Sequence, residues 1–458
     1  MQIKEFYRHM DDYVGKEVTI QGWIKQSRIS KNVGFLIVND GSFFKPVQVV
    51  ASSDMDNYRE VAHIPNGSSI EVQGKLVATP QAKQAFEIQA SSIRLLDACS
   101  LDYPLQNKRQ SFEFLRDHPS LRSRTNTFMA VFRLRSELAY AIHDFFHKEG
   151  FTYVHTPIIT ASDAEGAGEM FQATTLDLDQ IPKTEEGEVD YGEDFFGREV
   201  NLTVSGQLEV EPFIMSHRNV YTFGPTFRAE KSNTTRHAAE FWMIEPELAF
   251  ADNAMTMDNA EAMVKSVINH VMEALPEEMD FFNQWIDKGL IDRLNQVRHS
   301  SFARMTYTEA IEILEKANDR FDYKVKWGSD IQTEHERYLT EEVVHGPLFV
   351  TDYPKEIKSF YMKQNDDGKT VACFDMLVPG IGELIGGSER ETDPDKLTTL
   401  MNEKGMGTEG YEWYINLRRF GGCVHGGYGL GFERLVMYLS GMGNIRDVLP
   451  YPRTVGSL

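Results

Sequence analysis

The strongest constraint on the fold is a run of strand-like stretches near the start of the chain. Residues 17–97 contain five of them, EVTIQGWI, GFLIVND, PVQVVAS, SIEVQGKLV and FEIQASSIRLL. Apolar and polar residues alternate within each stretch, β-branched residues are frequent, and Gly, Asn or Asp separates one stretch from the next; these are the signals of β-strands. Five short strands in direct succession predict a small β-barrel.

A barrel of this size is of the kind that binds oligonucleotides or oligosaccharides. Phe35 and Gln48 are expected on neighbouring strands, where a ring can stack on a base and an amide can hydrogen-bond one. A small β domain without a ligand remains the alternative at this point, because each of the two residues is also common in ordinary strands.

Charge is distributed unevenly along the chain. The formal net charge of −22 argues against a protein that coats nucleic acid indiscriminately. Residues 104–135 carry seven Lys and Arg against two Asp and Glu, whereas residues 176–199 carry nine acidic and two basic residues. This pattern fits selective docking of a polyanion on the amino-terminal part, with the acidic stretch forming a surface insertion.

Composition excludes several other classes. Neither a secretory signal nor an apolar run of about 18 residues is visible, so we expect a cytoplasmic protein that does not span a membrane. Cys99, Cys373 and Cys423 are far apart and lack Cys-x-x-Cys spacing. A structural zinc site or a disulfide framework is therefore not expected.

The rest of the chain predicts an α+β fold with a largely antiparallel sheet flanked by helices, because long helices interrupt the strands without regular βαβ alternation. A Pro-, Arg- and Ser-containing hinge separates the two domains. The expected domains are 1–100, the barrel; 101–125, the hinge; and 126–458, the second domain with its insertion at 176–199. The expected helices cover 127–148, 254–274, 307–317 and 394–403, and FTYVHTP (151–157) is expected to be a strand.

Charges at every second residue mark two stretches, TFRAE and EFWMIEPEL, with a polar KSNTT loop between them. Side chains two apart on a strand point the same way, which pairs Arg228 with Glu230. The second stretch places four side chains on one face: Phe241, Met243, Glu245 and Glu247. A hairpin would combine a guanidinium for phosphate, a ring for a base and carboxylates for an ammonium or metal ion. A solvated hairpin face is the alternative, which an aromatic ring among the charges makes less favourable.

Two further stretches carry candidate functional residues. In GGYGLGFERLVMYLSG (426–441), three glycines leave room for a ligand, and Arg434 falls in the first turn of a helix, where a cation indicates an anion nearby. In CFDMLVPGIGELIGGSERE (373–391), Asp375 and Glu383 could hold Mg²⁺ against phosphates, and Arg390 could reach a small substrate. The three glycines are Gly427, Gly429 and Gly431.

These stretches together resemble the motifs of class II aminoacyl-tRNA synthetases. FTYVHTP, which ends at Pro157, is similar to motif 1 of that class, FRAE…RHAAEF to motif 2, and GLGFER to motif 3. A small barrel before the catalytic domain is similar to the aspartate, asparagine and lysine subgroup. Three stretches look like its asparagine enzymes, VSGQLEVE, GPTFRAEKSNTTRHAAEFWMIEPE and GELIGGSERE. The resemblance covers essentially the whole chain.

The resemblance implies a reaction and its partners. Asparagine and ATP would form asparaginyl-adenylate, whose aminoacyl group would pass to the terminal adenosine of tRNA(Asn). ATP and Mg²⁺ would be required, the barrel would bind the anticodon through Phe35 and Gln48, and Pro157 would support a homodimer interface.

The same resemblance implies roles for individual residues. Arg228 would hold the α-phosphate, Phe241 would stack on adenine, and Arg434 would cover the other face of the ring. The implied catalytic residues are Arg228, Glu230 and Arg434. The implied ATP-binding residues are Arg228, Glu230, Arg236, His237, Phe241, Glu383, Gly431 and Arg434, and the implied metal ligands are Asp375 and Glu383. The implied amino-acid-binding residues are Glu165, Ser205, Gln207, Glu211, Glu245 and Arg390.

Asparagine and aspartate are nearly isosteric, so the choice between them depends on charge. Aspartyl enzymes carry a lysine after their QSPQ element, and the corresponding VSGQLEVE (204–211) has none. We expect Glu211, or alternatively Glu209, to accept a hydrogen bond from the carboxamide and Arg390 to donate one to its carbonyl. Read as a strand without a bulge, the stretch would direct Glu211 to the opposite face, which leaves its geometry open.

Three alternative functions remain. They are an aspartyl or non-discriminating aspartyl-tRNA synthetase, an asparagine synthetase-like paralogue, and a non-catalytic RNA-binding relative. The absent lysine argues against the first, a barrel that would be idle against the second, and the complete set of motif residues against the third.

Overall fold

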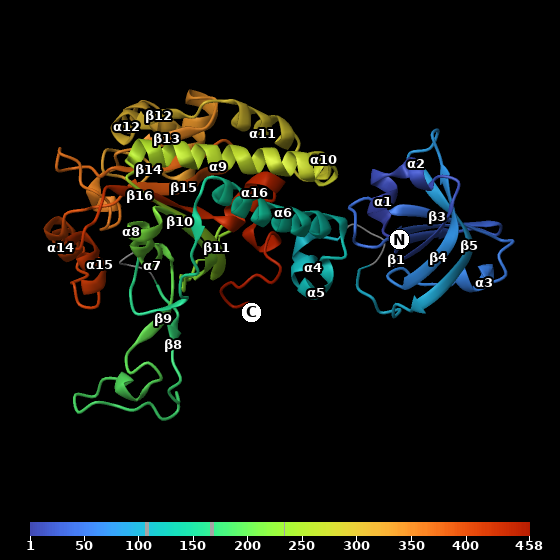
Figure 1. The fold of residues 1–458 in the computed structure, drawn as a ribbon, viewed down its shortest axis with the longest axis horizontal. Helices are drawn as coiled ribbons and strands as arrows, with labels where there is room; N and C mark the ends of the chain where they lie inside the picture. Colours follow the sequence, from blue (N-terminus) through green and yellow to red (C-terminus); the bar gives the residue numbers. More distant parts are fainter. Residues whose placement is uncertain (106–109, 165–168, 233) are drawn as a thin grey trace. The chain divides into compact units, whose positions relative to one another are not determined.

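The computed structural model describes residues 1–458 except 106–109, 165–168 and 233 (Figure 1). The chain divides into two compact units, Met1–Ala130 and Val131–Leu458, each with its own core. None of the helices among the described residues has the length and apolarity that crossing a lipid bilayer would require.

The first unit contains the predicted barrel. Its five strands close in the order β1-β2-β3-β5-β4, and all neighbours are antiparallel except the parallel pair β3 and β5. Alternate residues point inward, as Leu36 and Val38 do in β2, and form the core. The strands are β1 (Glu17–Ile29), β2 (Val33–Asn39), β3 (Val47–Ser52), β4 (Ser69–Ala78) and β5 (Phe86–Asp97). The helices are α1 (Ile3–Arg8), α2 (Met10–Tyr13), α3 (Tyr58–Val61), α4 (Phe112–Arg116) and α5 (Pro119–Arg122), while α6 (Asn126–Lys148) crosses into the second unit.

The second unit is built on an eight-stranded sheet in the order β12-β13-β14-β15-β16-β11-β10-β6. Only its outermost pairs are parallel, so the predicted α+β fold with a largely antiparallel sheet is confirmed. The strands are β6 (Thr152–Tyr153), β10 (Asn219–Phe227), β11 (Glu240–Ala249), β12 (Ala303–Thr306), β13 (Leu348–Thr351), β14 (Cys373–Val378), β15 (Gly382–Glu389) and β16 (His425–Gly431). A separate three-stranded sheet contains β7 (Ile159–Thr160), β9 (Val200–Leu202) and β8 (Gln172–Ala173).

Helices pack against this sheet as Figure 1 shows, with α9 lying along β14, β15 and β16. The predicted helix starts are confirmed, since Thr306 and Glu309 form a reciprocal capping box and Asp393 caps α14. The helices are α7 (Gln207–Val210), α8 (Ile214–His217), α9 (Asn253–Ala274), α10 (Pro276–Trp285), α11 (Leu290–His299), α12 (Tyr307–Lys316), α13 (Thr333–Arg337), α14 (Pro394–Glu403), α15 (Glu412–Arg419) and α16 (Phe432–Ser440). Short 3₁₀ turns are η1 (Tyr191–Glu193), η2 (Glu211–Phe213), η3 (Asn318–Arg320), η5 (Lys355–Ile357) and η6 (Ile445–Asp447), and η4 (Tyr338–Val343) is a π-helical turn.

Two stretches fold differently from their strand-like appearance. The strand expected over residues 151–157 is reduced to the two residues of β6. Within VSGQLEVE, residues Gln207–Val210 form the short helix α7, and Glu211 begins η2. The question of a strand bulge at Glu211 therefore does not arise.

The acidic stretch 176–199 extends away from the rest of its unit between β8 and β9 (Figure 1). Its base is held by Asp194, which accepts hydrogen bonds from the hydroxyl of Thr174 at 2.7 Å and the backbone N–H of Thr175 at 2.9 Å. The hydrogen bond from Thr174, followed by the one from Thr175, holds the pKa of the Asp194 carboxyl well below its usual range.

Candidate active site

The predicted hairpin forms the centre of the site. β10 and β11 pair with Thr226 opposite Phe241 and Thr222 opposite Glu245, so the alternate residues of β11 share one face of the sheet. β10 ends at Phe227, and Arg228 therefore begins the connecting loop instead of lying on the strand as expected. Its backbone N–H donates to the carbonyl of Ala239 at 3.0 Å, which fixes the start of the loop.

The glycines of β16 make room in two different ways. A Cβ on Gly427 would lie 2.3 Å from Oε1 of Glu247, so this glycine accommodates the glutamate and not a ligand directly. Gly429, by contrast, lines both cavities described below. The expectation that all three glycines face a ligand was therefore wrong for Gly427.

Two adjoining cavities, of 530 and 240 Å³, open on this face. Four residues belong to the walls of both: Arg228, Met243, Glu383 and Gly429. Arg228 is the only cation among them, so a ligand that extends from one cavity into the other passes this guanidinium.

All residues predicted to bind ATP line the smaller cavity: Arg228, Glu230, Arg236, His237, Phe241, Glu383, Gly431 and Arg434. The Arg228 guanidinium carbon lies 5.3 Å from the centre of the Phe241 ring. Nη1 of Arg434 donates to the carbonyl of Glu383 at 3.0 Å and lies 3.4 Å from its carboxylate. The cavity thus offers a flat aromatic ring beside concentrated positive charge, the combination that a nucleotide requires.

Arg236 and His237 lie in the loop after Arg228. Nη1 of Arg236 donates to the hydroxyl of Thr333 at 2.9 Å, and Nε2 of His237 is 3.8 Å from a carboxylate oxygen of Glu230. Burial, and next the positive charge of Arg434, lowers the pKa of Arg236. Positive charges that repel one another in this way would be stabilised by an anion.

The larger cavity contains Ser205, Gln207, Glu245 and Arg390 of the predicted amino-acid site. The carboxylate of Glu245 accepts hydrogen bonds from the hydroxyl of Ser205 and, at 2.9 Å, from the backbone N–H of Gly206. Gln207 is 7% exposed, and among the described residues its Nε2 has no hydrogen-bond partner. A buried amide left unpaired costs free energy, which indicates that a ligand group completes this site.

Arg390 lines this cavity and is ion-paired with Glu247. Its Nε and Nη2 donate to the two oxygens of Glu247, and Nη1 donates to the hydroxyl of Ser388 at 2.7 Å. Burial acts to lower the pKa of Arg390, but the Glu247 carboxylate raises it above its usual value. The guanidinium is therefore a fixed cation with N–H groups left over, since arginine carries five.

The predicted metal ligands lie close together. A Cβ on Gly386 would be 3.4 Å from an oxygen of Glu383 and 3.5 Å from one of Asp375, so both oxygens face the same point. Burial, followed by the charges of Glu383 and Asp375, raises the pKa of the adjacent Glu336 to about 8. Two carboxylates whose oxygens face the same point fit a divalent cation, which prefers oxygen ligands. In this structure, Nζ of Lys358 donates to both oxygens of Asp375, at 2.8 and 2.9 Å.

The remaining predicted amino-acid contacts are Glu165, Glu211 and its alternative, Glu209. Glu165 lies outside the described residues. Glu211 and Glu209 do not line either cavity: Glu211 is completely buried, and Glu209 accepts a hydrogen bond from the hydroxyl of Thr160 at 2.9 Å.

Some features of the site escaped prediction. Glu247 was expected on the same face as Glu245, but not as the ion-pair partner of Arg390. Lys358, Arg418 and His425 gave no signal in the sequence, because each meets its carboxylate from a distant part of the chain. Burial acts to raise the pKa of Glu211, but Arg418 and His425 hold it well below its usual value.

On the barrel, the two residues predicted to contact a base lie on one outer face. Phe35 of β2 pairs with Val50 of β3, and Gln48 lies two residues before Val50, so the two side chains are diagonal neighbours. Arg28 of β1 pairs with Phe35 from the other side and is exposed. Nε2 of Gln48 donates to the carboxylate of Glu87 at 2.9 Å. The face combines a half-buried ring with a cation and an amide.

Two protein-family models match this chain. Residues 111–455 match the family of tRNA synthetases class II (D, K and N). Residues 18–96 match the OB-fold nucleic acid binding domain.

Individual relatives are similar over nearly the whole chain. An asparagine--tRNA ligase of Desulfitobacterium hafniense is 60% identical over 453 residues, which are 99% of this chain and 98% of the relative. One from Acetivibrio thermocellus is also 60% identical, over 456 residues with the same coverage. The crystal structure of asparaginyl-tRNA synthetase from Pyrococcus horikoshii complexed with asparaginyl-adenylate has a TM-score of 0.85 at 32% identity, covering 98% of this chain and 97% of that one.

Proposed function

The chain belongs to the class II tRNA synthetases of the D, K and N group, and from this premise we propose that it is an ATP-dependent ligase that joins asparagine to tRNA(Asn). The observation that carries the proposal is the pair of cavities that meet at Arg228. One side offers a ring and cations for ATP, and the other offers carboxylate, amide and guanidinium groups for a small amino acid.

In the first step, a carboxylate oxygen of asparagine attacks the α-phosphorus of ATP, the bond to the bridging oxygen of the β-phosphate breaks, and pyrophosphate leaves. Reactions of this kind need positioning and charge neutralisation more than a protein base. Arg228 stabilises the negative charge that develops on the α-phosphate, while Arg236, His237 and Arg434 bind the outer phosphates and the nucleotide.

Asparagine lies in the larger cavity. Glu245, Ser205 and the amide oxygen of Gln207 accept hydrogen bonds from its α-ammonium, and Nε2 of Gln207 donates to an acceptor of the substrate. Arg390 uses an N–H not engaged by Glu247 or Ser388 to bind the side-chain carbonyl. Because Glu247 already neutralises Arg390, this guanidinium is not an uncompensated cation for a carboxylate side chain.

In the second step, a hydroxyl of the terminal adenosine of the tRNA attacks the carbonyl carbon of the adenylate, and AMP leaves. Phe35 and Gln48 bind the anticodon on the barrel. Asp375 and Glu383 would hold Mg²⁺, which would neutralise phosphate charge. We further propose that the protein is a homodimer in which Pro157 supports the interface, and that it acts in the cytoplasm.

ATP–pyrophosphate exchange, measured separately with asparagine and with aspartate, tests the proposal. We expect exchange that depends on asparagine, because VSGQLEVE (204–211) lacks the lysine that aspartyl enzymes carry after their QSPQ element. Exchange with aspartate alone would refute the specificity, and exchange with neither amino acid would refute the enzymatic function.

Replacing Phe35 by alanine tests the anticodon role. We expect the KM for tRNA to rise about tenfold, because stacking on one base is worth about 1–3 kcal/mol, while exchange without tRNA is unchanged. Trp23→Ala is the matched control, since Trp23 is an exposed aromatic residue of the same barrel that pairs with Asn39 and Ser69. Equal effects of the two variants on tRNA binding would contradict a dedicated role for Phe35.

A further inference from the structure

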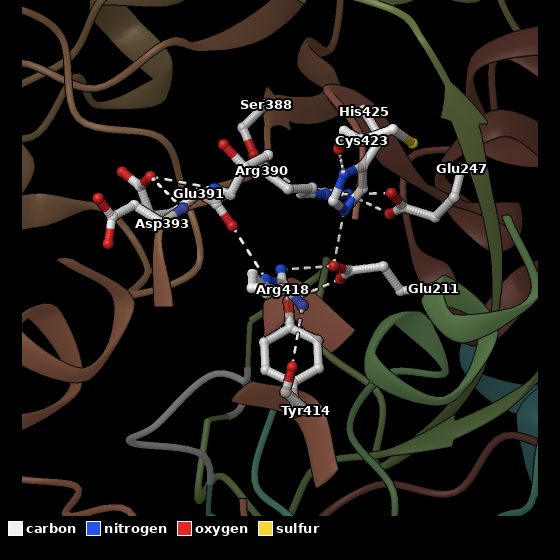
Figure 2. A network of polar contacts seen from close by, with 11 residues as sticks. Glu211, Glu247, Ser388, Arg390, Glu391, Asp393, Tyr414, Arg418, Cys423 and His425 are labelled. Atoms are coloured by element: carbon white, nitrogen blue, oxygen red, sulfur yellow. Dashed lines mark hydrogen bonds and ion pairs between the residues drawn. The ribbon is translucent and has the colours of Figure 1, made fainter. Parts of the chain in front are cut away.

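A buried carboxylate connects two helices that are far apart in the sequence. Glu211 directly follows α7, and Arg418 and Tyr414 belong to α15 (Figure 2). One oxygen of Glu211 accepts from Nη2 of Arg418 at 2.5 Å and from Nε2 of His425 at 2.7 Å. The other oxygen accepts from the hydroxyl of Tyr414 at 2.6 Å. The C-terminal end of α7 is therefore anchored by α15 and by the start of β16.

The opposite end of α7 is anchored as well. The carboxylate of Glu245 holds the backbone N–H of Gly206 and the hydroxyl of Ser205, and that hydroxyl accepts from the backbone N–H of Gln207 at 3.1 Å. Gln207 is thus the first residue of a four-residue helix with a carboxylate anchor at each end. A helix this short has little stability of its own, so tertiary contacts decide where its side chains lie.

The same network reaches the backbone on both sides of the Arg390 side chain. The backbone N–H of Arg390 donates to the carbonyl of His425 at 2.9 Å, and Nε of Arg418 donates to the carbonyl of Glu391 at 3.0 Å. Arg418 therefore contacts both Glu211, the carboxylate at the end of the helix that begins with Gln207, and Glu391, the residue that follows Arg390. The side chains of Gln207 and Arg390 both line the larger cavity.

Glu211, Glu247 and His425 also have the makings of a metal site, since one ligand atom of each lies within 4.8 Å of the others. Two guanidinium groups already meet these carboxylates, Arg418 at Glu211 and Arg390 at Glu247. In this cluster the two arginines compensate the charges of the two carboxylates.

Resting on the proposed function, we propose that Arg418 is a positioning residue for amino-acid recognition, which acts through Glu211 to hold Gln207 and through Glu391 to hold Arg390 against the substrate. Arg418 does not line either cavity. We expect its effect on asparagine and not on ATP, because Gln207 and Arg390 line the larger cavity and not the smaller one.

The test compares Arg418→Met with Arg419→Met in asparagine-dependent ATP–pyrophosphate exchange. Arg419 is the adjacent residue of the same helix and is exposed, so it controls for loss of charge. We expect Arg418→Met to raise the KM for asparagine tenfold or more with the KM for ATP unchanged, because a displacement of about 1 Å at a supporting position can cost ~10²-fold. Arg419→Met should leave both values unchanged.

A second pair of measurements separates positioning from folding. Arg418→Met removes the guanidinium from the buried Glu211 carboxylate, which then keeps only the contacts from His425 and Tyr414. The melting temperature should fall, and adding Glu211→Gln should restore part of it. The double variant should nevertheless keep the raised KM for asparagine, because the anchor of α7 is still missing. Recovery of the KM together with stability would overturn the proposal.

The remaining outcomes are also decisive. An unchanged KM for asparagine in folded Arg418→Met overturns the inference but not the proposed function, whereas wild-type protein without asparagine-dependent exchange overturns the proposed function. If Arg418→Met does not fold, Arg418→Lys replaces it. Lysine keeps the charge but not the planar fork, so we expect a smaller rise in the KM, and no rise would count against the proposal.

Discussion

Replacing Arg228 by alanine is expected to lower the rate of asparagine-dependent ATP–pyrophosphate exchange by about 10²–10³-fold, because this is the usual cost of removing one preorganised group that stabilises transition-state charge. Arg228 lines both cavities, and its guanidinium lies 5.3 Å from the centre of the Phe241 ring. The loss should fall mainly on kcat, since charge at the α-phosphate increases as the reaction proceeds.

Arg304→Ala is the matched control for this experiment. Its guanidinium carbon lies 5.8 Å from the ring of Phe349, so the substitution removes the same kind of contact from the edge strand β12, outside both cavities. We expect normal exchange in this variant and an unchanged far-ultraviolet circular dichroism spectrum in both. Near-normal turnover of Arg228→Ala would show that the phosphate binds elsewhere.

Replacing Arg390 by methionine is expected to have two large effects. Exchange with asparagine should be lost, because the substrate side chain loses its guanidinium donor. The free energy of unfolding should fall by about 3–5 kcal/mol, the typical cost of leaving one partner of a buried ion pair alone. The stranded partner is Glu247, which is completely buried. Unfolding in urea measures the second effect separately from exchange.

The variant Arg390→Met/Glu247→Gln distinguishes the two effects. Glutamine removes the unpaired charge, so we expect most of the unfolding free energy to return while exchange stays low. A double variant that regains both would show that Arg390 serves stability alone. A single variant with the wild-type KM for asparagine would show that the side chain of the substrate lies elsewhere in the cavity.

Much of the fold followed from local patterns. Alternation predicted the five barrel strands and the β10–β11 hairpin, because residues two apart on a strand must share a face. The same rule brought Phe241 and Glu245 to one surface, and all of the residues predicted for ATP line one cavity. VSGQLEVE was misread because eight residues are too few to distinguish a strand from a helical turn by periodicity.

Residue types and spacings of a few positions were enough to show which side chains could perform the chemistry and which of them share a strand. The partners of the buried charges could not be found in this way, because they depend on how the chain packs. Arg390 lies 143 positions from Glu247, and Arg418 lies 207 positions from Glu211. An ion pair of this kind forms because a charge buried in the protein interior requires a countercharge, and which one it meets depends on the packing of the whole chain.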